Sequence, residues 1–254
     1  MRLAAFLAAM EQIAPKELAL GFDNPGYLIG TEKAEIARVL VALDCTPAVA
    51  DEAAQGGYDL VLTHHPLFFH AVKHILPDDP ETAAAYRLLR HGVGLFAAHT
   101  NLDAAEGGVS QTLAETVGIT GIERFSENGI GCVGALATPM RLDELAALAY
   151  ERLGAPVRYT GDGARWITRA AAVGGAGGSE ILPARAAGAE AFLTGECAHH
   201  DALSADVCGL SVIACGHYET ERIVLPGLIR RLQTITNDVQ YQLAHSDHSP
   251  FSQA

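Results

Sequence analysis

The chain has 254 residues, of which 49% are hydrophobic and 26 are glycine, so it can form one large α/β unit or two smaller lobes with their own cores. This composition excludes a disordered chain, and the formal net charge of −13 argues against non-specific nucleic-acid binding. A small anionic ligand stays compatible with this charge, because bound metal ions can supply positive charge locally.

The first predicted element is an amphipathic helix near the start of the sequence. The apolar residues that fall on one helical face are Leu3, Phe6, Leu7, Met10 and Ile13. Glu11 interrupts the apolar run, which distinguishes the segment from a short signal peptide. No apolar stretch reaches the roughly 20 residues that a membrane span requires. We therefore expect a cytoplasmic protein without a membrane partner.

Apolar, strand-like runs then alternate with helical patterns, which predicts α/β layering. The predicted strands are 36–43, 59–63, 94–98, 131–137, 170–174, 191–194 and 210–214. The predicted helices are 47–55, 80–90, 109–117, 142–152, 181–187 and 217–233. Several strands are continuous apolar runs, as expected for a sheet with helices on both faces.

The polar, glycine-bearing segment 123–129 is the best internal boundary in the sequence. It predicts a first α/β lobe over residues 1–124 and a second over residues 125–254, each close to the common domain size. Candidate ligands follow strands in both halves, where open α/β sheets usually bind their ligands. A site built from all of them is expected in the cleft between the two lobes.

Two adjacent histidines, His64 and His65, follow the strand at 59–63. Consecutive strand residues face opposite sides, so both can reach one site only where the chain leaves the pleated strand. Pro66 favours such an ending, because it cannot donate a ladder hydrogen bond and restricts the residue before it. The alternative is one histidine buried in the core and one exposed to solvent.

His99, Asn101 and Asp103 form a second polar group, directly after the strand at 94–98. Asp103 could serve only in the first turn of the next helix. A turn role for Asp103 would not explain the nearby His99 and Asn101, so it is a less complete explanation of this group.

His217 and Glu221 form a third group, and their i, i+4 spacing places both on one face of a helix that begins near His217. Such a pair also occurs by chance on solvated helices. Three groups of this kind at strand ends are much harder to explain by chance than one. Together they predict a metal site.

Two further segments could contribute to chemistry. Glu196 ends the strand at 191–194 and is a candidate general base for proton transfer, or a residue that supports a metal ligand, or a residue at a helix N-terminus. The glycine-rich run 174–179 could cradle a phosphate or form a tight turn. It lacks the Gly-Lys-Ser/Thr ending of a P-loop.

The five cysteines, an odd number without a C-x-x-C pair, predict buried free thiols in a reducing compartment. Cys215 lies two residues before His217 and could therefore approach the metal site. A small apolar residue that ends a strand is the favoured reading of Cys215.

These motifs resemble those of the NIF-three-like family, also known as the GTP cyclohydrolase I type 2 family. The matching segments are Thr63-His64-His65-Pro66, His99-Thr100-Asn101-Leu102-Asp103, Thr194-Gly195-Glu196, and Gly216-His217 with Thr220-Glu221. Their order and spacing cover nearly the whole chain. One departure is Pro25 in the segment 21–26, where the family usually has valine after an aromatic-Asp-Asn sequence.

The resemblance implies a ring-shaped homohexamer and a dinuclear metal site. The ligands that it implies are His64, His65, Asp103, His217 and Glu221. Imidazole and carboxylate donors suit two divalent ions such as Zn, Mn or Fe(II). We therefore hypothesise a metal-dependent hydrolase that acts on a small anionic substrate, a nucleotide or a phosphorylated heterocycle, with Glu196 handling protons. The alternative is a non-catalytic metal-binding or nucleotide-sensing protein.

Overall fold

The computed structural model describes residues 1–252, and the chain forms two compact units. The first unit comprises Met1–Ala105 and Leu225–His248, and the second comprises Glu106–Val224 with the tail that begins at Ser249. This division differs from the one expected from the sequence at 123–129, because that segment joins two paired strands inside the second unit. The C-terminal part of the chain returns to the first unit and pairs with its sheet.

The first unit contains a five-stranded sheet in the order β1-β4-β3-β2-β11. Its strands are β1 (Gly26–Ile29), β2 (Arg38–Ala42), β3 (Leu60–Thr63), β4 (Gly94–Ala97) and β11 (Gln240–Leu243). All neighbouring pairs are parallel except β1 with β4, which is antiparallel. The central strands are fully buried, which explains their continuous apolar sequences.

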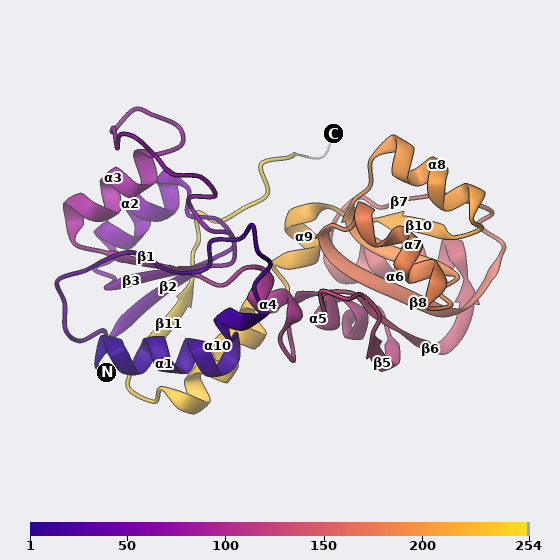
Figure 1. The fold of residues 1–254 in the computed structure, drawn as a ribbon, viewed down its shortest axis with the longest axis horizontal. Helices are drawn as coiled ribbons and strands as arrows, with labels where there is room; N and C mark the ends of the chain where they lie inside the picture. Colours follow the sequence, from indigo (N-terminus) through magenta and orange to yellow (C-terminus); the bar gives the residue numbers. More distant parts are fainter. Residues whose placement is uncertain (253–254) are drawn as a thin grey trace. The chain divides into compact units, whose positions relative to one another are not determined.

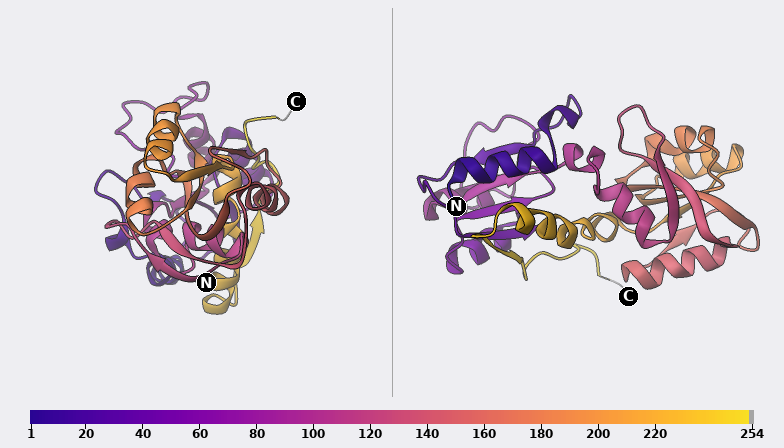
Figure 2. Two further views of the ribbon diagram at one scale, coloured as in Figure 1. Left: turned by 90° about the vertical axis from the view of Figure 1, so that its right-hand side faces the viewer. Right: turned by 90° about the horizontal axis from the view of Figure 1, so that it is seen from below.

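Helices cover both faces of this sheet (Figures 1 and 2). They are α1 (Leu3–Ile13), α2 (Pro47–Gln55), α3 (Ala83–His91) and α10 (Val224–Ile235), with the short helices η1 (Lys16–Leu18) and α4 (Thr100–Ala104). On one face α2 and α3 pack with the sheet into one apolar core. On the other face α1 and α10 lie together, and Phe6 of α1 contacts Phe96 edge to face at 6.2 Å.

The second unit contains a six-stranded sheet in the order β5-β6-β8-β9-β10-β7. Its strands are β5 (Ile119–Arg124), β6 (Cys132–Arg141), β7 (Arg158–Tyr159), β8 (Trp166–Ala176), β9 (Ala191–Glu196) and β10 (Ser211–Ala214). The three strands β8, β9 and β10 run parallel, so their carboxyl ends lie at one edge.

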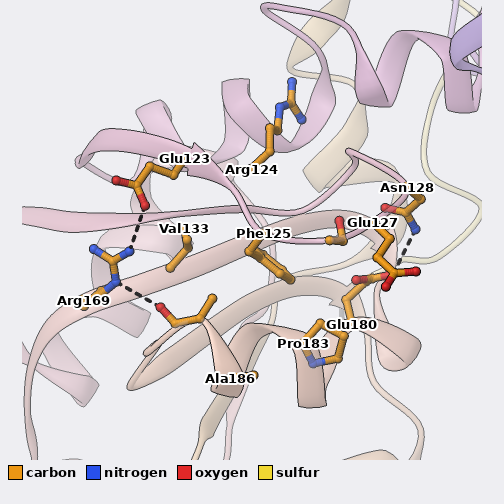
Figure 3. Close-up of a pocket in the computed structure, with 12 residues that line it drawn as sticks. Glu123, Arg124, Phe125, Glu127, Asn128, Val133, Arg169, Glu180, Pro183 and Ala186 are labelled. Carbon is orange, nitrogen blue, oxygen red and sulfur yellow. Dashed lines mark hydrogen bonds and ion pairs between the residues drawn. The ribbon is translucent and has the colours of Figure 1, made fainter.

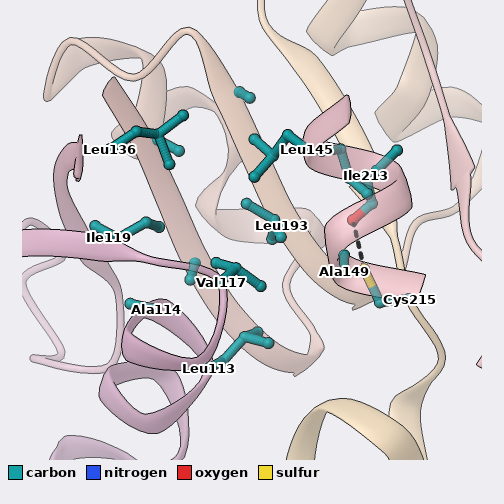
Figure 4. Packing of buried hydrophobic residues seen from close by; sticks show 14 of the residues in the cluster. Leu113, Ala114, Val117, Ile119, Leu136, Leu145, Ala149, Leu193, Ile213 and Cys215 are labelled. Carbon is teal, nitrogen blue, oxygen red and sulfur yellow. Dashed lines mark hydrogen bonds between the residues drawn. The ribbon is translucent and has the colours of Figure 1, made fainter. Parts of the chain in front are cut away.

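Six helices belong to the described part of this unit: α5 (Val109–Thr116), α6 (Leu142–Leu153), η2 (Gly178–Glu180), α7 (Ile181–Ala186), α8 (His199–Val207) and α9 (His217–Glu221). Side chains of α5 and α6 form one core with the sheet, in which Leu113, Leu145 and Leu193 are buried (Figure 4). Side chains of α7 and α8 form a second core on the same sheet. Each face is thus closed by helices, as the sequence predicted for an α/β fold.

The predicted long helix 217–233 is two helices in the structure. The first, α9, ends at Glu221, and α10 begins at Val224. Pro226 has no backbone N–H to continue a helix from α9, but it is tolerated in the first turn of α10, where N–H groups have no intrahelical acceptor. Pro226, in the middle of the predicted helix, therefore lies in the first turn of a second helix.

All five cysteines are free thiols, as predicted, although Cys197 and Cys208 are only partly buried. Cys215 packs in the core beneath α6, where burial raises the pKa of its thiol to about 12. It therefore stays protonated and serves as an apolar core residue. Among residues 1–252, no helix combines the length and apolar character needed to cross a bilayer.

Asp59 directly precedes β3, and its hydrogen bonds should make the stability of the fold depend on pH. Its carboxylate accepts hydrogen bonds from Lys33 Nζ (2.5 Å), the Ala37 amide (2.8 Å) and the Arg38 amide (3.0 Å). Burial raises its pKa, but these donors outweigh burial and lower it below the ordinary value. The stabilisation is therefore present above the unfolded pKa of about 4 and is lost as the pH falls below it.

Asp59→Asn is expected to lower the free energy of unfolding at pH 7 by about 1–3 kcal/mol, measured by urea denaturation. The difference from wild type should shrink between about pH 4 and pH 2. Asp78→Asn, at an exposed position, is the matched control and should change little. A loss that is independent of pH would contradict the role of the Asp59 charge.

Candidate metal centre

Strand alignment brings three polar segments together at the carboxyl edge of the first unit's sheet. In register, Ala42 of β2 pairs with Thr63 of β3, which pairs with Ala97 of β4. The second residue after each aligned position is Asp44, His65 or His99. Because the strands are parallel, these side chains emerge from one edge.

His64, His65 and His99 form a cluster at this edge. Their ring centroids lie 5.0 Å apart for His64–His65, 5.2 Å for His64–His99 and 5.5 Å for His65–His99. Each ring offers a nitrogen within 4.8 Å of the others'. The chain leaves the pleated strand at Thr63, whose hydroxyl donates to the His65 carbonyl at 2.8 Å. Adjacent histidines therefore reach the same site, as the strand-ending prediction required.

Each of these histidines has an oxygen acceptor at Nδ1. His64 Nδ1 lies 2.8 Å from the Ala98 carbonyl, His65 Nδ1 lies 2.8 Å from Asp44 Oδ1, and His99 Nδ1 lies 2.8 Å from Asp23 Oδ1. An acceptor at Nδ1 favours a proton there, which leaves the Nε2 lone pair of a neutral ring for a metal ion. This pattern fits a divalent cation.

Asp103 adds a carboxylate to the cluster. Its Oδ1 lies 3.6 Å from His64 Nε2, close to the distance of roughly 3–3.5 Å that separates two ligand atoms of one ion. Asp103 sits on the short helix α4, which begins after His99. Asn101 fixes this turn, because it accepts from the His99 amide at 2.9 Å and donates to the Ala14 carbonyl at 2.7 Å.

Asp23 is a fully buried carboxylate that orients His99 and the start of α4. It also accepts hydrogen bonds from the backbone amide (3.0 Å) and the hydroxyl of Thr100. Burial raises its pKa, but the hydrogen bonds from His99 and Thr100 prevail and lower it to about 2. Asp23 therefore remains charged at neutral pH beside His99. Pro25, which departs from the family pattern, lies two residues further on.

A second group lies at the carboxyl edge of the second unit's sheet. His217 Nε2 lies 3.2 Å from Glu221 Oε2, one turn along α9, as the i, i+4 spacing predicted. Glu196 at the end of β9 lies 3.5 Å from the other ring nitrogen of His217, Nδ1. The arrangement matches that of His65 and His99, in which a carboxylate faces Nδ1 and leaves Nε2 for a ligand role.

Two glycines make room for this pair. A Cβ on Gly175 would lie 2.1 Å from Glu221 Oε1 and 3.1 Å from His217 Nε2, and Gly175 has a φ of +63°. A Cβ on Gly195 would lie 2.8 Å from the Cα of His217. The backbones of β8 and β9 thus approach α9 closely because both positions are glycine.

The glycine-rich run does not form a phosphate cradle. The Gly175 amide donates to Thr220 Oγ1 at 3.1 Å, and the Gly177 amide donates to Thr194 Oγ1 at 3.0 Å. Thr194 Oγ1 in turn donates to the Gly175 carbonyl at 3.1 Å. These bonds occupy the amides of Gly175 and Gly177, so these two amides hold the loop in place beside His217 and Glu221 and are not open to a phosphate.

The structure brings the predicted residues into two groups, one in each unit. His64, His65 and Asp103 lie together in the first, and His217, Glu221 and Glu196 lie together in the second. His99 joins the first group, although the family resemblance did not include it among the ligands. Its place beside Asn101 and Asp103 in the sequence was a signal for it. No motif pointed to Asp44.

The fold and these groups define a two-unit α/β protein with candidate metal ligands at the carboxyl ends of parallel strands. The family model Duf34/NIF3 (NGG1p interacting factor 3) matches residues 1–250, and the chain belongs to this family. This confirms the resemblance inferred from the motifs.

Similar proteins and solved structures agree with this family assignment. A "GTP cyclohydrolase 1 type 2 homolog" of Clostridium perfringens is 34% identical, over 99% of each chain, and its namesake in Streptomyces coelicolor is 33% identical over 87% of this chain and 81% of its own. A Staphylococcus aureus protein of known structure, SA1388, is 28% identical with a TM-score of 0.92, over 100% of this chain and 99% of its own. A Bacillus cereus protein related to NIF3 is 22% identical with a TM-score of 0.94, over the same shares, and shows the shared fold.

Proposed function

We propose that the chain binds two divalent metal ions and acts as a metal-dependent hydrolase on a nucleotide or a phosphorylated heterocycle. The observation that carries the proposal is the cluster of His64, His65 and His99, each with an oxygen acceptor at Nδ1. Histidines that only fill a core need hydrogen-bond partners, but they need not bring a ring nitrogen of each within 4.8 Å of the others.

The ligands of the two proposed ions come from both groups. His64, His65 and Asp103 would contribute from the first unit, and His217 and Glu221 from the second, with His99 as an additional donor. The mixture of imidazole and carboxylate suits Zn, Mn or Fe(II). When bound, such ions would polarise the substrate and lower the pKa of water toward about 7.

The chain's own residues would orient donors and hold protons. Asp44 and Asp23 face Nδ1 of His65 and His99, where each carboxylate would hold a proton. Glu196 has the position to do the same for His217, and its carboxylate, more than half exposed, can also exchange a proton with a substrate. We therefore propose Glu196 as the group that transfers protons.

The substrate class rests on charge and on the names of relatives. The chain carries a net charge of −13, so attraction of an anionic nucleotide depends on a local cationic centre. Two relatives with at least 33% identity are named homologs of GTP cyclohydrolase 1 type 2. GTP is therefore the first substrate to test.

The test is elemental analysis of gently purified protein, followed by an activity screen with GTP, other nucleotides and phosphoesters. We expect about two metal ions per chain and turnover of at least one compound, abolished by a chelator and restored by metal. Metal without turnover across the panel would favour the non-catalytic alternative, and tight GTP binding without product would favour a nucleotide sensor. Protein that takes up no divalent metal would refute the proposal.

Asp44 is expected to affect metal binding indirectly, by orienting His65. Asp44→Asn keeps the size of the side chain but removes the charge that faces His65 Nδ1. We expect a 10- to 100-fold loss of metal affinity, measured by competition with a chelator, at nearly unchanged stability. Asp238→Asn, at an exposed position of the same unit, is the control. Equal affinity in both variants would contradict the orienting role.

We also propose that the protein assembles as a homohexameric ring in the cytoplasm, as the family resemblance implies. Light scattering after size-exclusion chromatography is expected to give six times the mass of one chain. A monomeric mass at micromolar concentration would contradict this proposal without bearing on metal binding.

A further inference from the structure

The second unit contains a cleft of about 740 Å³ that none of the candidate metal ligands lines (Figure 3). Its walls are the loop between β5 and β6 and the helix α7, and Val133 of β6 and Arg169 of β8 lie between them. The cleft therefore belongs to one unit and is built by elements that pack against the same sheet.

Glu180 is a buried carboxylate at one end of the cleft. The residue is 9% exposed, and its Oε1 accepts a hydrogen bond from Asn128 Nδ2 at 3.0 Å. Its Oε2 is buried and has no hydrogen-bond partner within residues 1–252. The side chain does not cap α7, although it directly precedes that helix. A buried carboxylate oxygen without a donor is costly, and N–H groups of a ligand would remove this cost.

Arg169 lies at the opposite end of α7. Its Nε donates to the carbonyl of Ala187, the residue after α7, at 3.3 Å, and its Nη2 lies 3.5 Å from Glu123. About a third of the side chain is exposed, so the guanidinium has donors left for another anion. Ala187 follows Glu180 by seven residues, most of them in α7. At the rise of an α-helix this corresponds to roughly 10 Å.

Apolar side chains lie between the two charged ends, in a cleft whose lining also includes the polar residues Arg124, Ser126 and Glu127. Phe125 and Val133 line it, and Pro183 and Ala186 of α7 lie opposite (Figure 3). The Phe125 ring is held against Gly131, where a Cβ would lie 2.3 Å from a ring carbon. Between these polar residues, the cleft presents the Glu180 carboxylate, the apolar side chains and the Arg169 guanidinium in that order (Figure 3).

We propose that this cleft binds a small zwitterion whose cationic and anionic groups are separated by a short apolar chain, as in a basic amino acid. The ammonium or guanidinium of the ligand bonds to Glu180, and its carboxylate bonds to Arg169, where Glu123 is a weak and exposed competitor. An extended lysine, with a hydrogen bond of about 3 Å at each end, spans a distance comparable to the length of α7.

The test is isothermal titration calorimetry of the full chain with L-lysine, L-arginine and ε-aminocaproate. Cadaverine lacks the anionic group and caproate lacks the cationic group, so both serve as half-ligands. We expect a dissociation constant of about 1 mM or lower for at least one zwitterion, and binding at least tenfold weaker for both half-ligands. Binding should be unchanged after treatment with a chelator, which separates this cleft from the proposed metal centre. Absence of heat with all three zwitterions at about 10 mM would overturn the proposal.

Three variants decide whether the cleft is the site. Glu180→Gln and Arg169→Gln should each weaken binding of the best zwitterion at least tenfold, and Arg169→Gln should leave weak cadaverine binding unchanged. Glu151→Gln, an exposed position on α6, makes the same charge change as Glu180→Gln and should have no effect. If Glu180→Gln does not fold, two other measurements show whether the ligand binds in this cleft. They are the affinity of Arg169→Gln and the ligand-induced shift of the Phe125 amide resonance. Full affinity in a folded Glu180→Gln or in Arg169→Gln would overturn the assignment.

Discussion

Gly175→Ala is expected to remove most metal binding that depends on the second unit. The new Cβ would lie 2.1 Å from Glu221 Oε1 and 3.1 Å from His217 Nε2, so both candidate ligands must move. The φ of +63° adds backbone strain, and we expect a loss of stability of about 1–3 kcal/mol. Metal affinity, measured by chelator competition, should fall at least about tenfold.

Gly154→Ala is the matched control for this prediction. Gly154 also lies in the second unit and has a φ of +69°, but a Cβ there would meet nothing within 4 Å. It ends α6 and contacts no candidate ligand. Its substitution should cost a similar backbone strain while leaving metal affinity intact. Equal metal affinity in the two variants would show that the position of His217 and Glu221 does not matter for binding.

His64→Ala is expected to abolish metal binding at the histidine cluster. His64 is 1% exposed and lies 3.6 Å from Asp103 through Nε2, so no exposed side chain can take its place easily. Elemental analysis should find at least one ion fewer per chain. The cavity left by the imidazole should cost about 1–3 kcal/mol, without unfolding the chain.

His64→Gln keeps most of the volume and can still donate to the Ala98 carbonyl, so it separates metal loss from cavity formation. It should lose metal as His64→Ala does, at a smaller cost in stability. The control is His74→Ala, an exposed histidine of the same unit. Unchanged metal stoichiometry in both His64 variants would refute the assignment of His64 as a ligand. Glu221→Ala applies the same measurement to the second group.

The buried parallel strands were predictable, but the edges of both sheets were not. The apolar runs of β3 and β4 have no polar face, so their sequences alone indicated buried strands. In contrast, β11 reads Gln-Tyr-Gln-Leu and is mostly exposed, and β7 has only two residues. Edge strands form because a neighbour offers unpaired backbone groups, and that neighbour is distant in the sequence.

The candidate ligands were predictable, but their supporting partners were not. His64, His65 and Asp103 follow strong strands, and their residue types at these positions marked them. Asp44 gains its meaning only from the alignment of β2 with β3, which places it beside His65. No local pattern encodes that register. The same holds for Asp23, which meets His99 across a separation of 76 residues.

The interrupted first unit has a consequence for biosynthesis. Its sheet includes β11, which pairs with β2, but segment 106–224 of the second unit lies between the two strands in the sequence. A ribosome that has made residues 1–224 has delivered all six strands of the second sheet but only four of the first. The second unit can then fold while the nascent chain still exposes the open edge of β2, a template for pairing with other chains. Release of the last segments, α10 and β11, closes that edge.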